Sequence, residues 1–194
     1  MTDERIKVKI SMVGDAQVGK TSLMVRYTKD VWDSSYIETL GVNFLHKSIN
    51  VSGNEVLVEI WDLGGQAEFR SMMSLACEGA HVVLYVFDLT RKATLNSMKT
   101  WFKQVRALNR AALPVLIGNK YDLFVALPPE EQEKMIKKAR EFAAAMRAQA
   151  LVFTSASHKI NVKKLFTGII AKLFDLPSGI SNITEPGAPL LEFK

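Results

Sequence analysis

The chain has 194 residues, 48% of them hydrophobic and 23% charged, with a formal net charge of +5. This length suits one domain with a single core, and this hydrophobic content excludes an intrinsically disordered chain. The lysine and arginine residues are scattered rather than gathered into one basic face, so we expect no nucleic-acid binding.

Short apolar segments alternate with helical patterns, which predicts an α/β fold with a mostly parallel sheet and helices on both faces. Only a polar turn separates the second predicted strand from the third, so these two should form an antiparallel hairpin. The six predicted strands are Ile6 to Val13, Val42 to Val51, Glu55 to Asp62, His81 to Asp88, Pro114 to Asn119 and Leu151 to Thr154. The five predicted helices are Lys20 to Thr28, Glu68 to Cys77, Thr94 to Leu108, Pro129 to Arg147 and Val162 to Asp175.

The predicted domain covers residues 1–176, and residues 177–194 should form an irregular tail because glycine and proline recur there. No cysteine lies near the C-terminus and Met1-Thr2 lacks the glycine needed for myristoylation, so we expect no lipid site. The sequence also shows no secretory signal and no run of about 18 apolar residues. We therefore expect no direct membrane anchor. The single cysteine, Cys77, excludes an internal disulfide and indicates a reducing compartment.

Residues 14–21 match the phosphate-loop pattern and lie between a predicted strand and a predicted helix, as that pattern requires. The loop amides and the helix N-terminus should bind phosphate groups. We expect Lys20 to bridge the β- and γ-phosphates and assist catalysis, and the Thr21 hydroxyl to bind Mg²⁺. The nucleotide-binding residues predicted in this segment are Gly14, Asp15, Ala16, Gln17, Val18, Gly19, Lys20, Thr21 and Ser22.

A second pattern begins at Asp62, which ends the third predicted strand and is followed by two glycines and Gln66. Asp62 is expected to hold Mg²⁺ through water, and the Gly65 amide to reach the γ-phosphate. Gln66 is the predicted catalytic residue that orients the attacking water. This prediction depends on the phosphate loop, because an aspartate at a strand end is by itself usually a turn residue.

A third pattern, Asn119-Lys120-Tyr121-Asp122, follows the fifth predicted strand. A carboxylate at Asp122 accepts hydrogen bonds from N1–H and the exocyclic amine of guanine, an edge that adenine lacks. Asn119 should tie the base to neighbouring loops, and the stem of Lys120 should cover the purine face. A backbone N–H for the guanine oxygen is expected from Ser155, Ala156 and Ser157.

These three patterns, in this order and at these intervals, resemble those of the Ras superfamily over residues 7–176. The resemblance implies a single P-loop NTPase domain of the Ras-like G type that binds GTP or GDP with Mg²⁺ and hydrolyses GTP slowly. It further implies that Thr39 binds Mg²⁺ and the γ-phosphate only in the GTP state. Trp32 matches an aromatic residue that packs on guanine, and Tyr36 a tyrosine that closes over the phosphates.

The segments Thr39 to Phe44, Ile60 to Gln66 and Phe87 to Ser97 are similar to those of the septum-promoting, mitotic-exit GTPases, a Rab-like group. This similarity implies a switch in septation or cytokinesis that recruits a protein kinase cascade or its scaffold. It also implies a two-part GTPase-activating protein (GAP) of the Rab-GAP type and an exchange factor as partners. We expect a cytoplasmic monomer recruited to a spindle pole body, centrosome or basal body.

The sequence departs from Ras at several positions of the site. Ala16 and Gln17 stand where Ras has glycine, and the Ala16 methyl group lies where a GAP arginine passes. Ser157 stands where a lysine is usual. Two alternatives remain open: a Rab-like regulator of membrane traffic, which the missing lipid cysteine disfavours, and a GTP-binding scaffold with negligible hydrolysis, which Gln66 disfavours.

Overall fold

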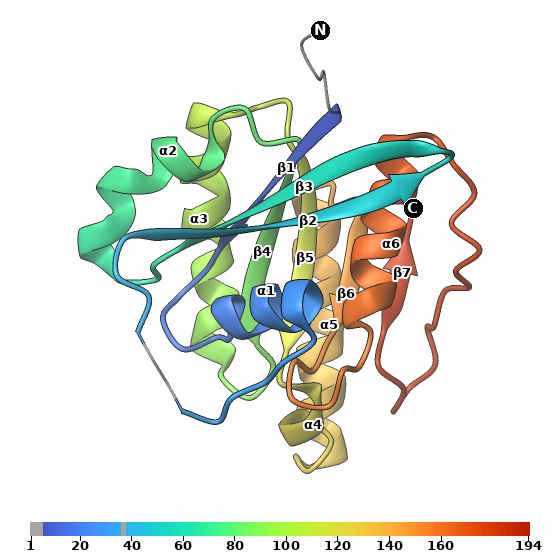
Figure 1. Ribbon diagram of the computed structural model, residues 1–194. Coiled ribbons are helices and arrows are strands. Elements are labelled where there is room, and N and C mark those ends of the chain that lie inside the picture. The colour runs from blue at the N-terminus through green and yellow to red at the C-terminus, as the bar shows by residue number, and fades with distance from the viewer. Residues whose placement is uncertain (1–5, 36–37) are drawn as a thin grey trace, which may run out of the picture.

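A twisted seven-stranded sheet runs through the middle of the molecule, with helices on both of its faces (Figure 1). The computed structural model describes residues 6–35 and 38–194. Within these residues the strands are β1 (Ile6–Val13), β2 (Val42–Val51), β3 (Asn54–Leu63), β4 (Val82–Asp88), β5 (Leu113–Asn119), β6 (Ala150–Phe153) and β7 (Leu191–Phe193). The helices are α1 (Lys20–Lys29), the 3₁₀ helix η1 (Ala67–Met72), α2 (Met73–Cys77), α3 (Lys92–Leu108), α4 (Tyr121–Phe124), α5 (Pro129–Ala145) and α6 (Val162–Leu173).

The strand order is β2-β3-β1-β4-β5-β6-β7. Strand β1 pairs in parallel with β3 and β4, and β5 pairs in parallel with β4 and β6, while β2 and β7 are antiparallel to their neighbours. The predicted α/β class, mostly parallel sheet and β2–β3 hairpin are therefore confirmed. Parallel strands end at a common edge, so the loops that follow β1, β4, β5 and β6 gather on one side of the sheet.

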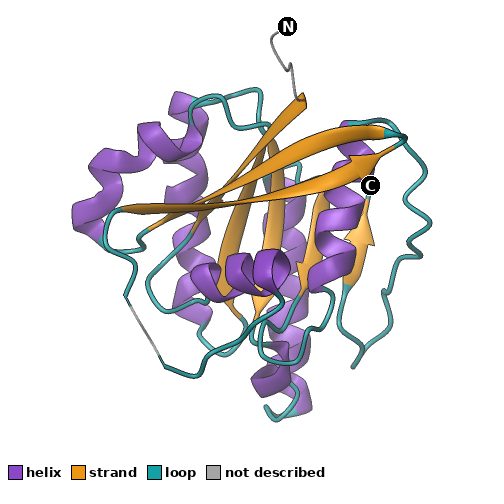
Figure 2. Cartoon of the chain, viewed as in Figure 1, coloured by secondary structure: helices purple, strands orange, loops and turns teal. Residues whose placement is uncertain are grey.

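Two hydrophobic layers, one on each face of the sheet, hold the helices in place. Helices α1 and α6 pack on one face, and α2, α3 and α5 pack on the other. Figure 2 shows this sandwich of helices around the orange strands. All seven residues of β4 are buried, because a central parallel strand is covered on both faces. Within the described residues, no helix has both the length and the apolar character needed to cross a bilayer.

Several helix boundaries differ from the predictions. The single helix predicted over residues 68–77 is instead η1 followed by the short α2, since η1 buries none of its residues while α2 buries Met73, Ala76 and Cys77. The four-residue helix α4 was not predicted, because it is too short to show a periodic pattern. Helices α5 and α6 end two residues early, before Arg147 and Asp175, which both adopt left-handed backbone conformations.

The prediction that residues 177–194 form an irregular tail is wrong at the end of the chain. Strand β7 pairs with β6 through Ala150 and Phe193, Leu151 and Glu192, and Val152 and Leu191. Leu190 and Leu191 are both 0% exposed. The sheet therefore has seven strands rather than the six predicted, and the last residues of the chain pack into the core of the domain.

Candidate functional site

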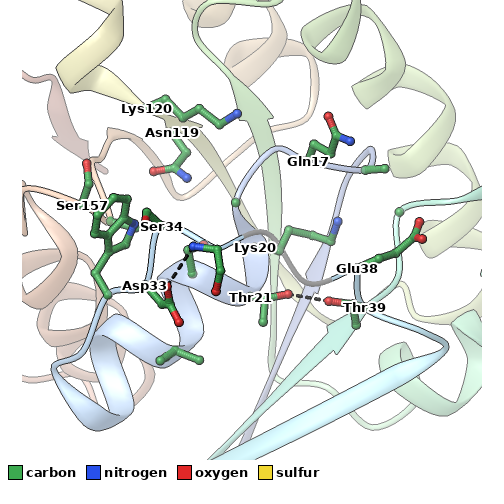
Figure 3. A pocket seen from close by; sticks show the side chains of 18 of the residues that line it. Gln17, Lys20, Thr21, Asp33, Ser34, Glu38, Thr39, Asn119, Lys120 and Ser157 are labelled. Atoms are coloured by element: carbon green, nitrogen blue, oxygen red, sulfur yellow. Dashed lines mark hydrogen bonds between the residues drawn. The ribbon is translucent and has the colours of Figure 1, made fainter.

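A cavity of about 470 Å³ opens at the edge of the sheet where the parallel strands end, a volume typical of small-molecule sites. Figure 3 shows Thr21 and Thr39 at one end of it and Asn119 and Ser157 at the other. The predicted site residues that line it are Ala16, Gln17, Gly19, Lys20, Thr21, Ser22, Trp32, Thr39, Gly65, Gln66, Asn119, Lys120, Asp122, Ala156 and Ser157. Predicted site residues that contact this lining without forming part of it are Gly14, Asp15, Val18, Asp62 and Ser155. Tyr36 lies outside the described residues.

The loop between β1 and α1 needs glycine at two positions because other parts of the chain approach its backbone closely. Gly14 has φ +147°, and a Cβ atom there would lie 2.1 Å from the carbonyl oxygen of Val86. Gly19 has φ +93°, and a Cβ atom there would lie 2.4 Å from Nδ2 of Asn119. These contacts pack the loop against β4 and the end of β5, so its backbone is placed for phosphate groups at the N-terminus of α1.

Lys20 places its ammonium group inside this loop. Its Nζ donates hydrogen bonds to the carbonyl oxygens of Gly14 at 2.9 Å and Asp15 at 3.0 Å, and the residue is only 6% exposed. Burial lowers the pKa of Lys20, while the carboxylates of Asp62 and Asp15 act in the opposite direction. The loop thus holds a buried cation at the position that the predicted phosphate site requires.

Three oxygen-bearing side chains meet next to Lys20. The Thr21 hydroxyl lies 2.6 Å from the Thr39 hydroxyl (Figure 3). The Thr21 hydroxyl also donates to Oδ2 of Asp62, and the Thr39 hydroxyl lies 3.4 Å from the same Oδ2. Asp62 is 0% exposed, and its Oδ1 has no hydrogen-bond partner among the described residues. Burial raises the pKa of Asp62, and Lys20 and the two hydroxyls oppose this rise.

This oxygen cluster fits a magnesium ion. Mg²⁺ prefers hard oxygen ligands and is usually held by one or two carboxylates together with water and substrate phosphates. The two hydroxyls are such ligands, and the unpartnered Oδ1 of Asp62 is free to accept a hydrogen bond from a water molecule bound to the ion. No group of three or more histidine, cysteine, aspartate or glutamate side chains suited to a metal occurs in the described part of the chain. The remaining ligands would therefore have to come from nucleotide and water.

The loop after β3 touches both the phosphate loop and the segment that carries Thr39. A Cβ atom on Gly65 would lie 2.2 Å from the backbone nitrogen of Ala16, so only glycine fits there. The Gly64 amide donates to the carbonyl oxygen of Gly41 at 2.8 Å, and a Cβ on Gly64 would lie 2.6 Å from the carbonyl oxygen of Thr39. The structure thus brings together the three segments predicted to surround a terminal phosphate.

At the other end of the cavity, Asn119 and Asp122 are held by neighbouring loops. Nδ2 of Asn119 donates to the carbonyl oxygen of Val18 at 2.9 Å, and its Oδ1 accepts from the Thr154 hydroxyl at 3.1 Å. Oδ1 of Asp122 accepts from the Ser155 hydroxyl at 2.6 Å. Asn119 therefore links the phosphate loop to the residue that follows β6, and the Asp122 carboxylate is oriented at the cavity wall.

The Lys120 ammonium group makes a contact that was not predicted. It lies 2.8 Å from Oδ2 of Asp88, to which Nε of Arg91 also donates at 2.9 Å. Arg91 in turn donates to the carbonyl oxygen of Ala16 at 3.0 Å. Burial works to raise the pKa of Asp88, but hydrogen bonds from Lys120 and Thr90 outweigh it and hold this pKa below its usual value.

Asp88 and Arg91 thus connect the base-binding end of the site to the phosphate loop, and neither was predicted as a site residue. Asp88 carries the same signal as Asp62, an aspartate at the end of a buried strand. A second missed pair is Trp101 and Asp15: Nε1 of Trp101 in α3 donates to the Asp15 side chain at 2.8 Å. Neither Arg91 nor Trp101 has a local sequence pattern that indicates its contact.

The sequence matches the family model described as the Ras family over residues 9–175. The chain is 48% identical over 196 residues to the septum-promoting GTP-binding protein 1 of Schizosaccharomyces pombe, an alignment that covers 100% of this chain and 98% of the relative. It is 31% identical over 182 residues to the Ras-related protein RABD1 of Arabidopsis thaliana, covering 93% of this chain and 86% of the relative. It is also 33% identical over 178 residues to the GTP-binding protein YPTM1 of Zea mays, covering 91% and 83%.

The family match spans nearly the whole chain and includes every loop that surrounds the cavity. The predicted resemblance to the Ras superfamily, with septum-promoting and Rab-like relatives, is confirmed. Members of this family bind GTP and GDP with Mg²⁺ and interact with activating proteins, exchange factors and effectors. The chain therefore belongs to the Ras family and is a small GTPase switch of the Ras and Rab type.

Proposed function

We propose that the protein binds GTP or GDP in this cavity, hydrolyses GTP slowly without a GAP, and acts as a switch in septation. The observation that carries the proposal is the meeting of the Thr39 and Gly65 segments on the phosphate loop beside Asp62. A terminal phosphate bound there would touch all three segments, so its presence or loss would change their positions.

Guanine recognition would use the end of the cavity that Asp122 and Asn119 form. Because Ser155 holds one oxygen of Asp122, the carboxylate is oriented before the base arrives. It would accept from N1–H and the exocyclic amine of guanine. Adenine has no such pair of donors, so the site would favour GTP over ATP.

At the phosphate end, Lys20 would exchange its hydrogen bonds to the Gly14 and Asp15 carbonyl oxygens for phosphate oxygens. Thr21 and Thr39 would supply hydroxyl ligands to Mg²⁺, and Asp62 would act through a water molecule. When bound, Mg²⁺ spreads the negative charge of the phosphoryl group that is transferred.

Hydrolysis would depend on Gln66, which lines the cavity next to Gly65. Its side chain would orient a water molecule that attacks the γ-phosphorus, the bond to the β–γ bridging oxygen would break, and GDP and phosphate would form. Among the described residues that line the cavity there is no arginine. Intrinsic hydrolysis should therefore be slow, and a GAP would supply the missing cation.

Exposed apolar side chains near the Thr39 and Gly65 segments support recognition by partners. Leu40 is 75% exposed, Phe44 53% and Leu75 58%, and the Phe44 ring stacks on Trp61 with centroids 5.1 Å apart. A Cβ atom on Gly41, next to Leu40, would lie 3.1 Å from the Met72 sulfur, so the segment before β2 adjoins the helix η1 that precedes Leu75. Neighbouring exposed apolar side chains are typical of protein-binding surfaces. Effectors bound there would sense the positions of Thr39 and Gly65.

The septation role rests on the likeness to the fungal septum-promoting GTP-binding protein 1, which is 48% identical to this chain. The proposed partners are a protein kinase cascade or its scaffold, a two-part GAP of the Rab-GAP type and an exchange factor. We place the protein as a monomer in the cytoplasm, recruited through protein contacts to a spindle pole body, centrosome or basal body. The alternative, a regulator of membrane traffic, is supported by the likeness to the Ras-related protein RABD1.

The variant Asp122→Asn should lower GTP affinity by about tenfold to a hundredfold, because it removes a charged acceptor from two hydrogen bonds. Binding of xanthosine triphosphate should improve, since the new amide donates to the C2 carbonyl of xanthine. Competition binding measures both effects. Asp33→Asn is the matched control, because Asp33 is another carboxylate that lines the cavity. An unchanged preference for GTP in Asp122→Asn would contradict the base-reading role.

The variant Gln66→Leu should slow intrinsic GTP hydrolysis by about a hundredfold, because no polar group remains to position the water. Single-turnover assays with purified protein measure this rate, and GTP affinity should stay near that of the wild type. Gln149→Leu, the same change outside the cavity lining, should hydrolyse GTP normally. A wild-type rate in Gln66→Leu would remove this residue from the mechanism.

The protein tagged at its endogenous level should collect at spindle poles or basal bodies during mitosis. Live imaging through division tests this, because the septation role places the switch at a microtubule-organising centre. A signal on vesicles in place of the poles would support the membrane-traffic alternative and contradict the septation role.

A further inference from the structure

The C-terminal segment, residues 183–193, packs against the two base-binding loops. One of these loops carries Asp122, and the other carries Ala156 and Ser157. Strand β7 lies beside β6 at the edge of the sheet (Figure 1). The amide of Phe153, the last residue of β6, donates to the carbonyl oxygen of Leu190 at 2.8 Å. Leu190 and Leu191 are fully buried. The segment is therefore fixed to the strand from which one base-binding loop starts.

The first link between this segment and the site is Tyr121, which stands between Lys120 and Asp122. Its hydroxyl donates to the carbonyl oxygen of Gly187 at 2.7 Å, and its amide donates to the carbonyl oxygen of Thr154 at 3.0 Å. Tyr121 is only 7% exposed. Tyr121 therefore links the loop that carries Asp122 both to the C-terminal segment and to the second base-binding loop, which follows β6.

The second link is Asn161, at the end of the loop that presents Ala156 and Ser157. Its Nδ2 donates to the carbonyl oxygens of Phe153 at 2.9 Å and Pro189 at 3.0 Å. Ser155 and Ile160 exchange two backbone hydrogen bonds of 3.1 and 3.0 Å within the same loop. One amide group therefore closes the base of this loop and attaches it to the C-terminal segment.

We propose that the C-terminal segment holds both base-binding loops in place and that Tyr121 and Asn161 are positioning residues for guanine. This inference rests on the proposed nucleotide-binding function and deepens it. Release of a nucleotide would break the contacts between the base and these loops, and both links stabilise the loop positions that allow those contacts. A partner that detaches the segment would accordingly accelerate nucleotide exchange.

Two conservative variants remove the links without emptying the core. Tyr121→Phe deletes only the hydroxyl, and Asn161→Gly deletes the amide while glycine accepts the left-handed backbone at φ 56°. In each variant fluorescent GDP should dissociate about threefold to tenfold faster, as expected for the loss of a buried hydrogen bond. Inosine diphosphate lacks the exocyclic amine that Asp122 reads, so its dissociation should accelerate less. The difference between the dissociation rates of GDP and inosine diphosphate should therefore become smaller in the variants. A general loss of stability would instead accelerate the dissociation of both nucleotides equally.

Asn109→Ala is the matched control, because the Asn109 amide donates to the carbonyl oxygens of Cys77 at 2.8 Å and Ala80 at 2.9 Å, outside the C-terminal segment and the base-binding loops. Its dissociation rates for both nucleotides should stay near those of the wild type. Wild-type rates in Tyr121→Phe and Asn161→Gly would overturn the inference, as would an equal acceleration in Asn109→Ala. A wild-type protein that binds no GDP would instead contradict the proposed function from which the inference starts.

Discussion

The buried carboxylate of Asp62 is the constraint on which the rest of the site depends. A charged carboxylate that is 0% exposed is costly unless cations and hydrogen-bond donors surround it. Lys20, Thr21 and Thr39 provide these groups from α1 and from the loop before β2, yet one carboxylate oxygen keeps no partner within the described chain. A cation and phosphate oxygens bound beside this oxygen would complete the arrangement, so the positions of these segments would depend on what is bound.

The two ends of the cavity have different roles in the proposed switch. At the phosphate end the Thr39 and Gly65 segments meet on the phosphate loop and are placed to respond to a terminal phosphate. At the base end, Asn119 is hydrogen-bonded to the phosphate loop and Asp122 to Ser155. Tyr121, which lies between them, is hydrogen-bonded to the C-terminal segment, so the positions of these residues are fixed. Asp88 joins the ends, since Lys120 and Arg91 both bind it and Arg91 also reaches the phosphate loop.

Local patterns in the sequence predicted the strands and loops whose conformation depends on nearby residues. Strands β1 and β2 begin and end where predicted. The glycines of the phosphate loop also indicated a segment whose backbone other parts of the chain approach closely, as the structure shows. Strand β7 was missed because three residues show no periodicity and their burial comes from tertiary contacts. The contacts of Arg91 with Ala16 and of Tyr121 with Gly187 join residues 75 and 66 positions apart, so no short pattern encodes them.

The central claim is that a terminal phosphate orders the Thr39 and Gly65 segments together. Amide hydrogen exchange on protein loaded with GDP or with a slowly hydrolysed GTP analogue tests this directly. The account predicts slower exchange at residues 38–42 and 64–66 with the analogue than with GDP, and unchanged exchange in the buried strand β4. Equal exchange of both segments in the two nucleotide states would contradict it.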